Sequence, residues 1–540
     1  MKITFLGAAH QVTGSHTLVE WSDNRYFLVD YGMEQGENDL EMAELPVSPS
    51  IIEYVFLTHA HIDHSGLLPL LYKQGFRGRI YATAETTALC SIMLADSAQI
   101  QETDAASETK KNLRTGGPEV IPLYTVEDAA KTMEFFNPCE YNKIYMIDEG
   151  LSIRFIDAGH LLGSSFIEFF LEDQGKTVQL VCSGDVGNIN QPIIKDPQAV
   201  TEADYLLIES TYGNRLHDTV KEPIPILIDV LKKTFERKGS VIIPSFAVGR
   251  TQELLYFFRE IKQNHLMPPD MEGFKVYVDS PLANEATTIF SEHVYDCYDE
   301  EAMALYEKGI NPIAFPGLRN SITSDDSKAI NFDDEPKVII SASGMCDAGR
   351  IKHHLKHNLW YEDATILFVG YQATGTLGRS LIEGAQEVKL FGEPVHVAAH
   401  IVQMPGISGH ADVNGLLDWI SAFTEKPQRV FVTHGEDSVA ELFAGRLRDE
   451  KGLNASAPYS GTVYDLASNE CVYEAAGIRL EKKTGQTPKS QKAAMVYQKL
   501  VAAGQRLMSV IRKNEGTPNK ELDRFAREVQ SLCDRWDRKE

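Results

Sequence analysis

The chain has 540 residues, about three to four times the length of an ordinary domain, so we expect at least two globular units. Hydrophobic residues make up 43% of the chain and charged residues 24%, which excludes collagen-like and wholly disordered proteins. The formal net charge is -25, from 52 Lys and Arg against 77 Asp and Glu, which excludes a uniformly basic surface for nucleic acid. Composition alone therefore favours small, neutral or cationic substrates.

Cysteine usage and the N-terminal residues indicate the compartment. The seven cysteines lie far apart and form no C-x-x-C pair, so neither a disulfide framework nor a thiolate zinc site is expected. The first residues lack the apolar core of a secretory signal, and no apolar run reaches the length of about 18 residues that a membrane span needs. We expect a reducing, cytoplasmic location and no membrane association.

The first part of the chain alternates short strands with helices. Strands are predicted at 3–6, 17–20, 25–29 and 54–57, and helices at 65–73 and 84–101, with a polar surface segment at 108–117. Strands resume after Gly150. This pattern predicts a mixed α/β body.

A second pattern begins near Lys221, where longer helices alternate with apolar strands. Helices are predicted at 225–238, 250–263 and 351–358, and strands at 241–244, 274–278 and 365–369. Such alternation indicates βαβ units and a parallel sheet. Strands at 393–402 and 429–432 then suggest a return to the first body, which makes the second body an insertion. We place the first domain at 1–210 and 391–478, and the inserted domain at 211–390.

The C-terminal extension, residues 479–540, differs from the rest in charge. After a linker rich in Pro, Gly and Lys, helices are predicted at 491–512 and 519–537. The extension carries a net charge of +7, which leaves -32 on the remainder. The basic groups are therefore concentrated at one end of an acidic chain.

The strongest chemical signal is the run from Thr58 to Gly66, directly after an apolar strand. A tight loop leaving a strand can direct His59 and His61 to the same side, while Asp63 and His64 begin the next helix. Four nitrogen and oxygen ligands in so short a run exceed the needs of one zinc ion with an open position, and they suit two adjacent metals. Three histidines beside an aspartate are improbable by chance in a chain with 16 His.

Further candidate ligands occur where other apolar strands meet glycine-containing loops. His160, Asp185 and His434 all occupy such positions. Any one of them alone would more often be a turn or capping residue. In combination with the first run, they favour a binuclear metal centre.

Several motifs in order resemble those of a known family. The segments HAHIDHSG, AGHLLGS and SGDVG resemble the metallo-β-lactamase superfamily. Further segments resemble its β-CASP branch, which contains RNA-processing nucleases such as the cleavage and polyadenylation nuclease subunit and ribonuclease J. They are ESTYGNR, PSFAVGRTQEL, VDSPLA, SASGM, GYQATGTLGR, SGHAD and VTHGE. The resemblance covers approximately residues 1–475. It implies an αββα sandwich with an inserted β-CASP α/β domain containing a parallel sheet, and it leaves the helical extension unexplained.

The resemblance implies two Zn²⁺ ions per chain and a ligand set for each. One ion would be held by His59, His61 and His160. The other would be held by Asp63, His64 and His434, with Asp185 bridging the pair. Asp30, in FLVDYG, matches the family's first acidic motif and would orient the ligand loop from behind. A purely structural role for Asp30 is the alternative.

The chemistry implied is hydrolysis of a phosphodiester. Two metals about 3.5 to 4 Å apart can hold a bridging hydroxide and polarise a phosphoryl oxygen for in-line attack. The family's proton donors match Glu209 and His410, where a Glu-bound imidazole stays protonated as the general acid. The predicted catalytic residues are thus Asp63, Asp185, Glu209 and His410. For Glu209 or His410 taken alone, a capping or loop role is the alternative.

Four other residues are candidate RNA phosphate ligands. Eukaryotic relatives carry a histidine in G-T-L-x-x-H, where this chain has Ser380 beside Arg379. Arg379 would bind a phosphate, with a salt-bridged surface arginine as the alternative. Arg250 and Ser343 lie in strand-to-helix turns that could hold phosphate or be tight connections without a ligand.

One further histidine cluster is interpreted as structural. His353, His354 and His357 lack the glutamate of an H-E-x-x-H zinc motif. A polar helix face is therefore favoured over a third metal site.

We expect a zinc-dependent ribonuclease of RNA processing or decay, acting on single-stranded RNA with a metal-bound hydroxide and leaving 5'-phosphate and 3'-hydroxyl ends. A homodimer is a candidate assembly. A DNA nuclease, a small-ester or thioester metallo-hydrolase and an inactive RNA-binding scaffold stay open as alternatives. The histidine at position 410 disfavours the DNA branch, the inserted domain disfavours a small ester, and the full ligand set disfavours a scaffold. The motifs do not separate endonuclease from 5'-to-3' exonuclease action.

Overall fold

The computed structural model describes residues 1–36, 40–114, 117–217, 223–370, 372–373, 375–404, 408–480 and 519–536. They belong to two compact units, Met1–Arg479 and Leu480–Glu540. Within these ranges, no helix combines the length and apolar character needed to cross a bilayer.

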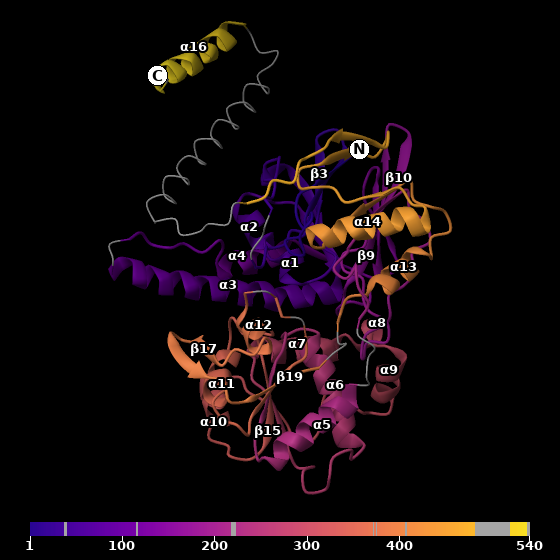
Figure 1. Ribbon diagram of the computed structural model, residues 1–540. Helices are drawn as coiled ribbons and strands as arrows, with labels where there is room; N and C mark the ends of the chain where they lie inside the picture. Colours follow the sequence, from indigo (N-terminus) through magenta and orange to yellow (C-terminus); the bar gives the residue numbers. More distant parts are fainter. Residues whose placement is uncertain are drawn as a thin grey trace. The chain divides into compact units, whose positions relative to one another are not determined.

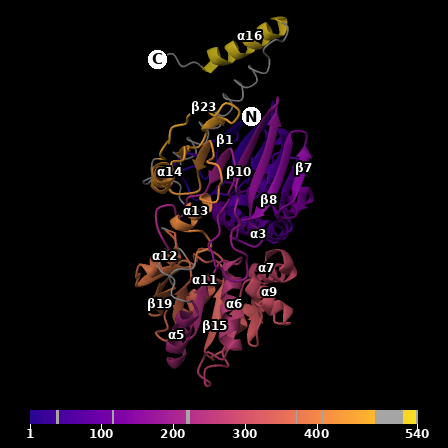
Figure 2. The same ribbon diagram turned by 90° about the vertical axis from the view of Figure 1, so that its right-hand side faces the viewer.

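Two mixed β-sheets form the centre of the first unit (Figures 1 and 2). The eight-stranded sheet has the order β23-β22-β1-β2-β3-β4-β5-β6. Its strands are β1 (Lys2–Phe5), β2 (Thr17–Ser22), β3 (Arg25–Val29), β4 (Ile52–Phe56), β5 (Arg79–Thr83), β6 (Phe136–Cys139), β22 (Val463–Asp465) and β23 (Glu470–Tyr473). The seven-stranded sheet has the order β21-β20-β11-β10-β9-β8-β7. Its strands are β7 (Ile144–Asp148), β8 (Leu151–Asp157), β9 (Ser165–Asp173), β10 (Lys176–Cys182), β11 (Tyr205–Ile208), β20 (Arg429–Val432) and β21 (Ala455–Ser456).

The two sheets pack face to face through an apolar core to which both contribute. In β1, the buried residues Ile3 and Phe5 alternate with partly exposed ones, the period-two pattern of a strand with one buried face. Across the interface, Phe27 stacks on Phe169 with ring centroids 4.9 Å apart, and Phe5 lies 4.8 Å from Phe431. Burial of each phenyl ring contributes about 1.5 to 3 kcal/mol to stability.

Helices cover the outer faces of both sheets. The first sheet is covered by α1 (Ile62–Ser65), α2 (Leu68–Lys73), α3 (Ala84–Arg114) and α4 (Val126–Thr132), with 3-10 turns at η1 (Pro49–Ile51) and η2 (Met133–Phe135). The second is covered by α13 (Val413–Ile420) and α14 (Asp437–Lys451). The ring of Trp419 in α13 packs 4.5 Å from that of Phe166 in β9. The predicted αββα sandwich is confirmed.

Helix α3 is longer than its apolar pattern predicts. Sequence periodicity indicated a helix at 84–101 and a polar surface segment at 108–117, but the helix continues to Arg114. The additional turns contain strong helix formers such as Glu102, Lys110 and Lys111, which sustain a solvated helix without an apolar stripe. In Figure 1, α3 runs along the side of the sandwich that faces the inserted body, and it contacts α7 (Pro281–Glu292).

The inserted body is built around a parallel sheet of six strands with the order β14-β13-β15-β12-β16-β19. Its strands are β12 (Val241–Pro244), β13 (Lys275–Val278), β14 (Leu318–Asn320), β15 (Lys337–Ser341), β16 (Thr365–Phe368) and β19 (His400–Gln403). Its other helices are α5 (Pro223–Glu236), α6 (Arg250–Gln263), α8 (Val294–Cys297), α9 (Glu300–Glu307), α10 (Ser324–Ile330), α11 (Ile351–Asn358) and α12 (Leu377–Ile382). A hairpin of β17 (Glu387–Leu390) and β18 (Glu393–His396) lies beside it.

One strand assignment changes where the chain returns to the sandwich. The segment 393–402 was expected to rejoin the first body, and the return was placed at 391. Instead, β19 pairs in parallel with β16 at the edge of the inserted sheet. The return to the sandwich therefore follows Gln403. The predicted position differs because the apolar alternation of a short strand does not specify which sheet the strand joins.

The second unit contributes one described helix, α16 (Asn519–Trp536), at the position predicted for the last helix of the chain. The helix predicted at 491–512 lies outside the described residues.

Candidate metal centre and active site

Parallel strands of the second sheet bring distant residues to one edge. β10 pairs with β11, and β11 pairs with β20, all in parallel. Because carboxyl ends of parallel strands meet at the same edge, the loops that follow them place Asp185, Glu209 and His434 together. The insertion leaves the sandwich after β11, so it departs from this same edge.

The first sheet and β8 supply the remaining predicted ligands. His59 and His61 follow β4, Asp63 and His64 lie in α1, and His160 follows β8. The loop after β4 is held close to its neighbour, since a Cβ atom built on Gly32 would lie 1.6 Å from the carbonyl oxygen of Asp63. Only glycine permits this approach.

Two neighbouring clusters result, and together they contain all seven predicted ligands. One comprises His59, His61, His160 and Asp185, and the other comprises Asp63, His64 and His434. Within each cluster the candidate ligand atoms lie within 4.8 Å of one another.

Asp185 faces both clusters with different oxygen atoms. Its Oδ2 lies 3.4 Å from Nε2 of His59 and 3.5 Å from Nε2 of His160. Its Oδ1 lies 3.3 Å from Nε2 of His64 and 3.6 Å from Nε2 of His434. This is the arrangement required of a carboxylate that bridges two cations.

The rest of each cluster has similar spacing. Nδ1 of His61 lies 3.0 Å from Nε2 of His59 and 3.3 Å from Nε2 of His160. In the other cluster, Nε2 of His434 lies 3.1 Å from Nε2 of His64 and 3.7 Å from Oδ2 of Asp63. Tetrahedral zinc with bonds of about 2.0 to 2.1 Å to nitrogen requires ligand atoms about 3.3 to 3.4 Å apart. The residues present therefore fit zinc.

Hydrogen bonds on the outer side of the rings fix which nitrogen faces the centre. Nδ1 of His160 lies 3.0 Å from the carbonyl oxygen of Gly409, and Nδ1 of His64 lies 2.7 Å from Oδ2 of Asp30. A carbonyl or carboxylate oxygen can only accept here, so each Nδ1 donates and each Nε2 faces the centre. Among the described residues, buried Oδ1 of Asp185 has no hydrogen-bond donor. Ring nitrogens and carboxylate oxygens that converge in this way form a donor set suited to a cation.

The ligand rings differ in their electrostatics. Although burial alone would lower it, the charges of Asp185 and Asp30 raise the pKa of His64 well above its ordinary value. Burial lowers the pKa of His59, His61 and His160, that of His61 to about 3, so these rings are neutral ligands at physiological pH. Although burial alone would raise it, the pKa of Asp185 is held well below its ordinary value by the neighbouring His434 and His64. The carboxylate of Asp185 is therefore ionised.

Asp30 contacts the ligand loop directly. It accepts hydrogen bonds from the backbone N–H of Thr58 at 2.8 Å and from the Thr58 hydroxyl at 2.9 Å, besides its contact with His64. Its φ of +58° lies in the left-handed region, which aspartate tolerates better than most residues. Asp30 thereby orients His64 and the loop that carries His59.

Glu209 and His410 form a pair at the edge of the metal clusters. Both oxygens of Glu209 lie 3.2 Å from Nδ1 of His410, and Oε1 also accepts the backbone N–H of Val186 at 2.6 Å. Burial acts to lower the pKa of His410, but the charges of Glu209 and Asp185 outweigh it and raise the pKa to about 9. The imidazole can therefore carry a proton at neutral pH.

The four predicted phosphate ligands have intramolecular partners. Arg250 pairs with Glu253 within α6, and Arg379 of α12 pairs at 2.6 Å with Glu383, which follows the helix. The hydroxyl of Ser343 donates to the carbonyl of Ala348, and that of Ser380 donates to the carbonyl of Thr376. Phosphate binding by these residues stays a prediction.

Some contributing residues carried no sequence signal. The hydroxyl of Thr211 lies 3.1 Å from Nδ1 of His434, and His217 contacts the turn that carries His410. Both follow β11 in ESTYGNRLH, where the resemblance had singled out Glu209 alone. The interpretation of 353–357 as a polar helix face is wrong for His354, which is buried with Nε2 2.6 Å from Oδ2 of Asp279.

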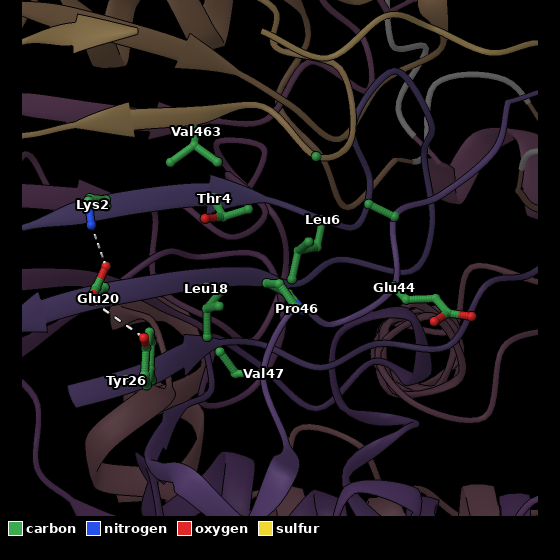
Figure 3. A pocket seen from close by; sticks show the side chains of 12 residues that line it. Lys2, Thr4, Leu6, Leu18, Glu20, Tyr26, Glu44, Pro46, Val47 and Val463 are labelled. Atoms are coloured by element: carbon green, nitrogen blue, oxygen red, sulfur yellow. Dashed lines mark hydrogen bonds and ion pairs between the residues drawn. The ribbon is translucent and has the colours of Figure 1, made fainter. Parts of the chain in front are cut away.

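A separate cavity of about 290 Å³ lies beside β1 and β2 (Figure 3). Lys2 and Glu20 form an ion pair of 2.9 Å at its edge, and Leu6 and Leu18 contribute apolar walls. None of the seven metal-cluster residues lines it. The reactive groups therefore lie elsewhere in the fold.

Three family models match successive parts of the chain. They are the metallo-beta-lactamase superfamily domain over residues 18–179, the Beta-Casp domain over 251–381 and the Zn-dependent metallo-hydrolase RNA specificity domain over 394–458. Ribonuclease TTHA0252 of Thermus thermophilus is 35% identical over 84% of this chain and 98% of its own length. An RNase J-like protein of Methanocaldococcus jannaschii is 30% identical over 86% and 99%. Transcription termination factor FttA of Methanosarcina mazei is 30% identical over 81% and 67%.

Proposed function

The chain belongs to the β-CASP branch of the metallo-β-lactamase superfamily, and we propose that it is a zinc-dependent ribonuclease. The observation that carries the proposal is the convergence of histidine ring nitrogens on both oxygens of Asp185. The relative named a ribonuclease, matched over nearly its whole length, supports RNA as the substrate.

The two clusters would hold one zinc ion each, with Asp185 shared between them. When bound, the ions would activate water and neutralise charge on the phosphoryl oxygens. The protein's own residues fix the ligand rings through Asp30, Thr58 and Gly409, so that little reorganisation is needed on binding.

Glu209 and His410 supply the proton that the leaving group needs. As the water oxygen bonds to phosphorus, the bond from phosphorus to the 3' oxygen breaks, and that oxygen takes a proton from the imidazolium of His410. The products carry a 5'-phosphate and a 3'-hydroxyl. The nearby carboxylate of Glu209 stabilises the charged imidazole until transfer.

Burial of the centre favours single-stranded RNA. His59, His64, Asp185 and His434 are each no more than 4% exposed. A single strand can extend one phosphate toward such a centre, whereas a duplex holds its phosphates on a wide, stiff cylinder. We therefore propose single-stranded RNA as the substrate and place the DNA, ester and scaffold alternatives behind it.

Product mapping on defined RNAs tests the proposal. Wild-type protein is incubated with linear RNA bearing a 5'-monophosphate or 5'-triphosphate and with circular RNA, with a chelator and with zinc restored. We expect cleavage that the chelator abolishes, with 5'-phosphate ends; cleavage of the circle identifies endonuclease action. Chelator-resistant cleavage, 3'-phosphate products, or turnover confined to DNA or to a thioester would contradict it.

A matched variant separates this activity from a contaminating nuclease. Asp185→Asn removes the bridging charge, and Asp229→Asn removes an exposed carboxylate paired with Lys233 on α5. RNA cleavage should be lost only in Asp185→Asn.

A further inference from the structure

We propose that His217 is a positioning residue that holds the His410 turn in place for proton transfer to the leaving group. The proposal deepens the proposed function and rests on it. His217 lies in the crossover segment, defined here as residues 210–217, through which the chain leaves β11 for the inserted domain.

The contact between the two histidines is direct. Nε2 of His217 lies 2.8 Å from the carbonyl oxygen of His410, and since a carbonyl oxygen can only accept, the imidazole donates its N–H. The backbone N–H of His217 also donates to Oδ2 of Asp412 at 3.1 Å. Asp412 in turn caps α13, where its Oδ1 accepts N–H groups of Asn414 and Gly415. His217 thus ties the His410 turn to the start of a helix.

Packing makes the crossover segment a stiff support. The ring of Tyr212 lies 4.7 Å from that of His217 and 6.1 Å from that of His410. The guanidinium of Arg215 lies 4.7 Å above the ring of Tyr212, and the carbonyl of Arg215 accepts the N–H of Val413 at 3.2 Å. The segment therefore contacts the turn at its side chains and along its backbone.

Other contacts hold the opposite side of the turn. The N–H of Ala411 donates to the carbonyl of Val186 at 2.8 Å, and the N–H of Asn188 donates to that of Gly409 at 3.0 Å. With these in place, removal of His217 should shift His410 relative to Glu209 without unfolding the site. A displacement of about 1 Å costs on the order of a hundredfold in rate, which sets the expected scale.

The role predicts a dependence on the leaving group. The 3' oxygen of RNA needs a proton as it departs, whereas the nitrophenolate of bis(p-nitrophenyl) phosphate departs without one. A residue that positions the general acid should matter for the first substrate and not for the second. A residue that merely stabilises the fold or the metal clusters should matter equally for both.

The experiment compares His217→Ala, His217→Phe and His217→Gln, because glutamine can donate an N–H to the same carbonyl while phenylalanine keeps the ring and cannot. We expect kcat on RNA to fall about 10- to 100-fold in Ala and Phe, with KM, zinc content, melting temperature and turnover of bis(p-nitrophenyl) phosphate within about twofold of wild type. Gln should recover most of the loss. His265→Ala, an exposed histidine paired with Glu272, is the control.

Three results would overturn the proposal. They are equal losses on both substrates, an unchanged kcat on RNA in His217→Phe, and a loss that appears only in KM. If the His217→Ala variant is unstable, the comparison of His217→Phe with His217→Gln decides whether His217 positions His410. Absence of RNA cleavage by the wild type would defeat the proposed function and this inference with it, whereas wild-type cleavage with an indifferent His217 would defeat the inference alone.

Discussion

Both carboxylate oxygens of Glu209 lie 3.2 Å from Nδ1 of His410, although the two residues are separated by the whole inserted domain. Glu209 directly follows the strand β11 and is buried, so water screens its charge only weakly. The chain therefore inserts a domain between an acid and the residue whose protonation that acid controls.

Glu209→Gln should impair proton transfer while leaving the metal ligands in place. Glutamine keeps an oxygen to accept the N–H of Val186 but removes the charge that stabilises the imidazolium of His410, so the pKa of His410 should fall from about 9. We expect kcat on RNA to drop about 10²- to 10⁴-fold, with its decline at alkaline pH beginning earlier. Steady-state kinetics across pH measure both effects. Glu127→Gln, at an exposed ion pair with Lys131, is the control, and an unchanged pH profile would refute the assignment.

Asp185→Asn should weaken zinc binding at both clusters together. The substitution keeps the size of the side chain but removes the negative charge that faces four histidines. We expect fewer than two zinc ions per chain after dialysis against a metal buffer in which the wild type stays loaded. Metal analysis by mass spectrometry gives the stoichiometry. Retention of two ions would show that Asp185 is not the bridge.

Asp30→Asn tests the orientation of His64. Asparagine tolerates the positive φ at this position and can still accept from Thr58, but it loses the charge that holds the Nδ1 proton of His64. Loss of such an outer contact typically costs about 10- to 100-fold in metal affinity. Competition with a chelator of known affinity measures this, and an affinity equal to that of wild type would leave Asp30 with a purely structural role.

The clustering of the predicted ligands could be anticipated from the sequence because each stands beside a local signal. His160, Asp185 and His434 all follow an apolar strand directly, and the order of β-sheet edges then brings them together. The roles of Thr211 and His217 could not be predicted, because they depend on how the crossover segment folds back against residues some two hundred positions later.

Two other differences have the same physical origin. The strand 400–403 is apolar enough to join a sheet of either body, and only tertiary packing places it beside β16. His354 looks like part of a polar helix face, but its carboxylate partner, Asp279, comes from the end of a strand far along the chain. Local periodicity contains no information about such partners.

Asp157→Asn should stabilise the protein at alkaline pH. Burial raises the pKa of Asp157 from 3.8 to about 7, so the folded state binds a proton that the unfolded chain releases. The bound proton contributes at most about 4 kcal/mol to the free energy of unfolding. This contribution is fully present below about pH 4 and is lost as the pH rises through 7. Asparagine cannot ionise and keeps an oxygen for the N–H of Gly159. The melting temperature of the variant should exceed that of the wild type at pH 8, and the two should be equal near pH 4. A difference in melting temperature that does not change with pH would contradict this prediction.

Removal of the C-terminal extension should reduce the salt dependence of RNA binding. Residues 479–540 carry +7 on a chain whose remainder carries -32. The compact first unit ends at Arg479, which pairs with Asp437 at 2.7 Å, so truncation after Leu480 leaves that contact intact.

Each phosphate contact in single-stranded RNA contributes about 0.7 to the slope of log affinity against log salt. The Glu209→Gln background, in which cleavage is slowed while the metal ligands stay in place, allows binding to be measured by fluorescence anisotropy from low to moderate salt. We expect the truncated chain to bind several-fold more weakly at low salt and with a shallower slope, because the acidic body repels RNA outside the metal centre. An identical slope with and without residues 481–540 would mean that the extension takes no part in attracting RNA, and that the positive charge of the metal centre alone overcomes the repulsion.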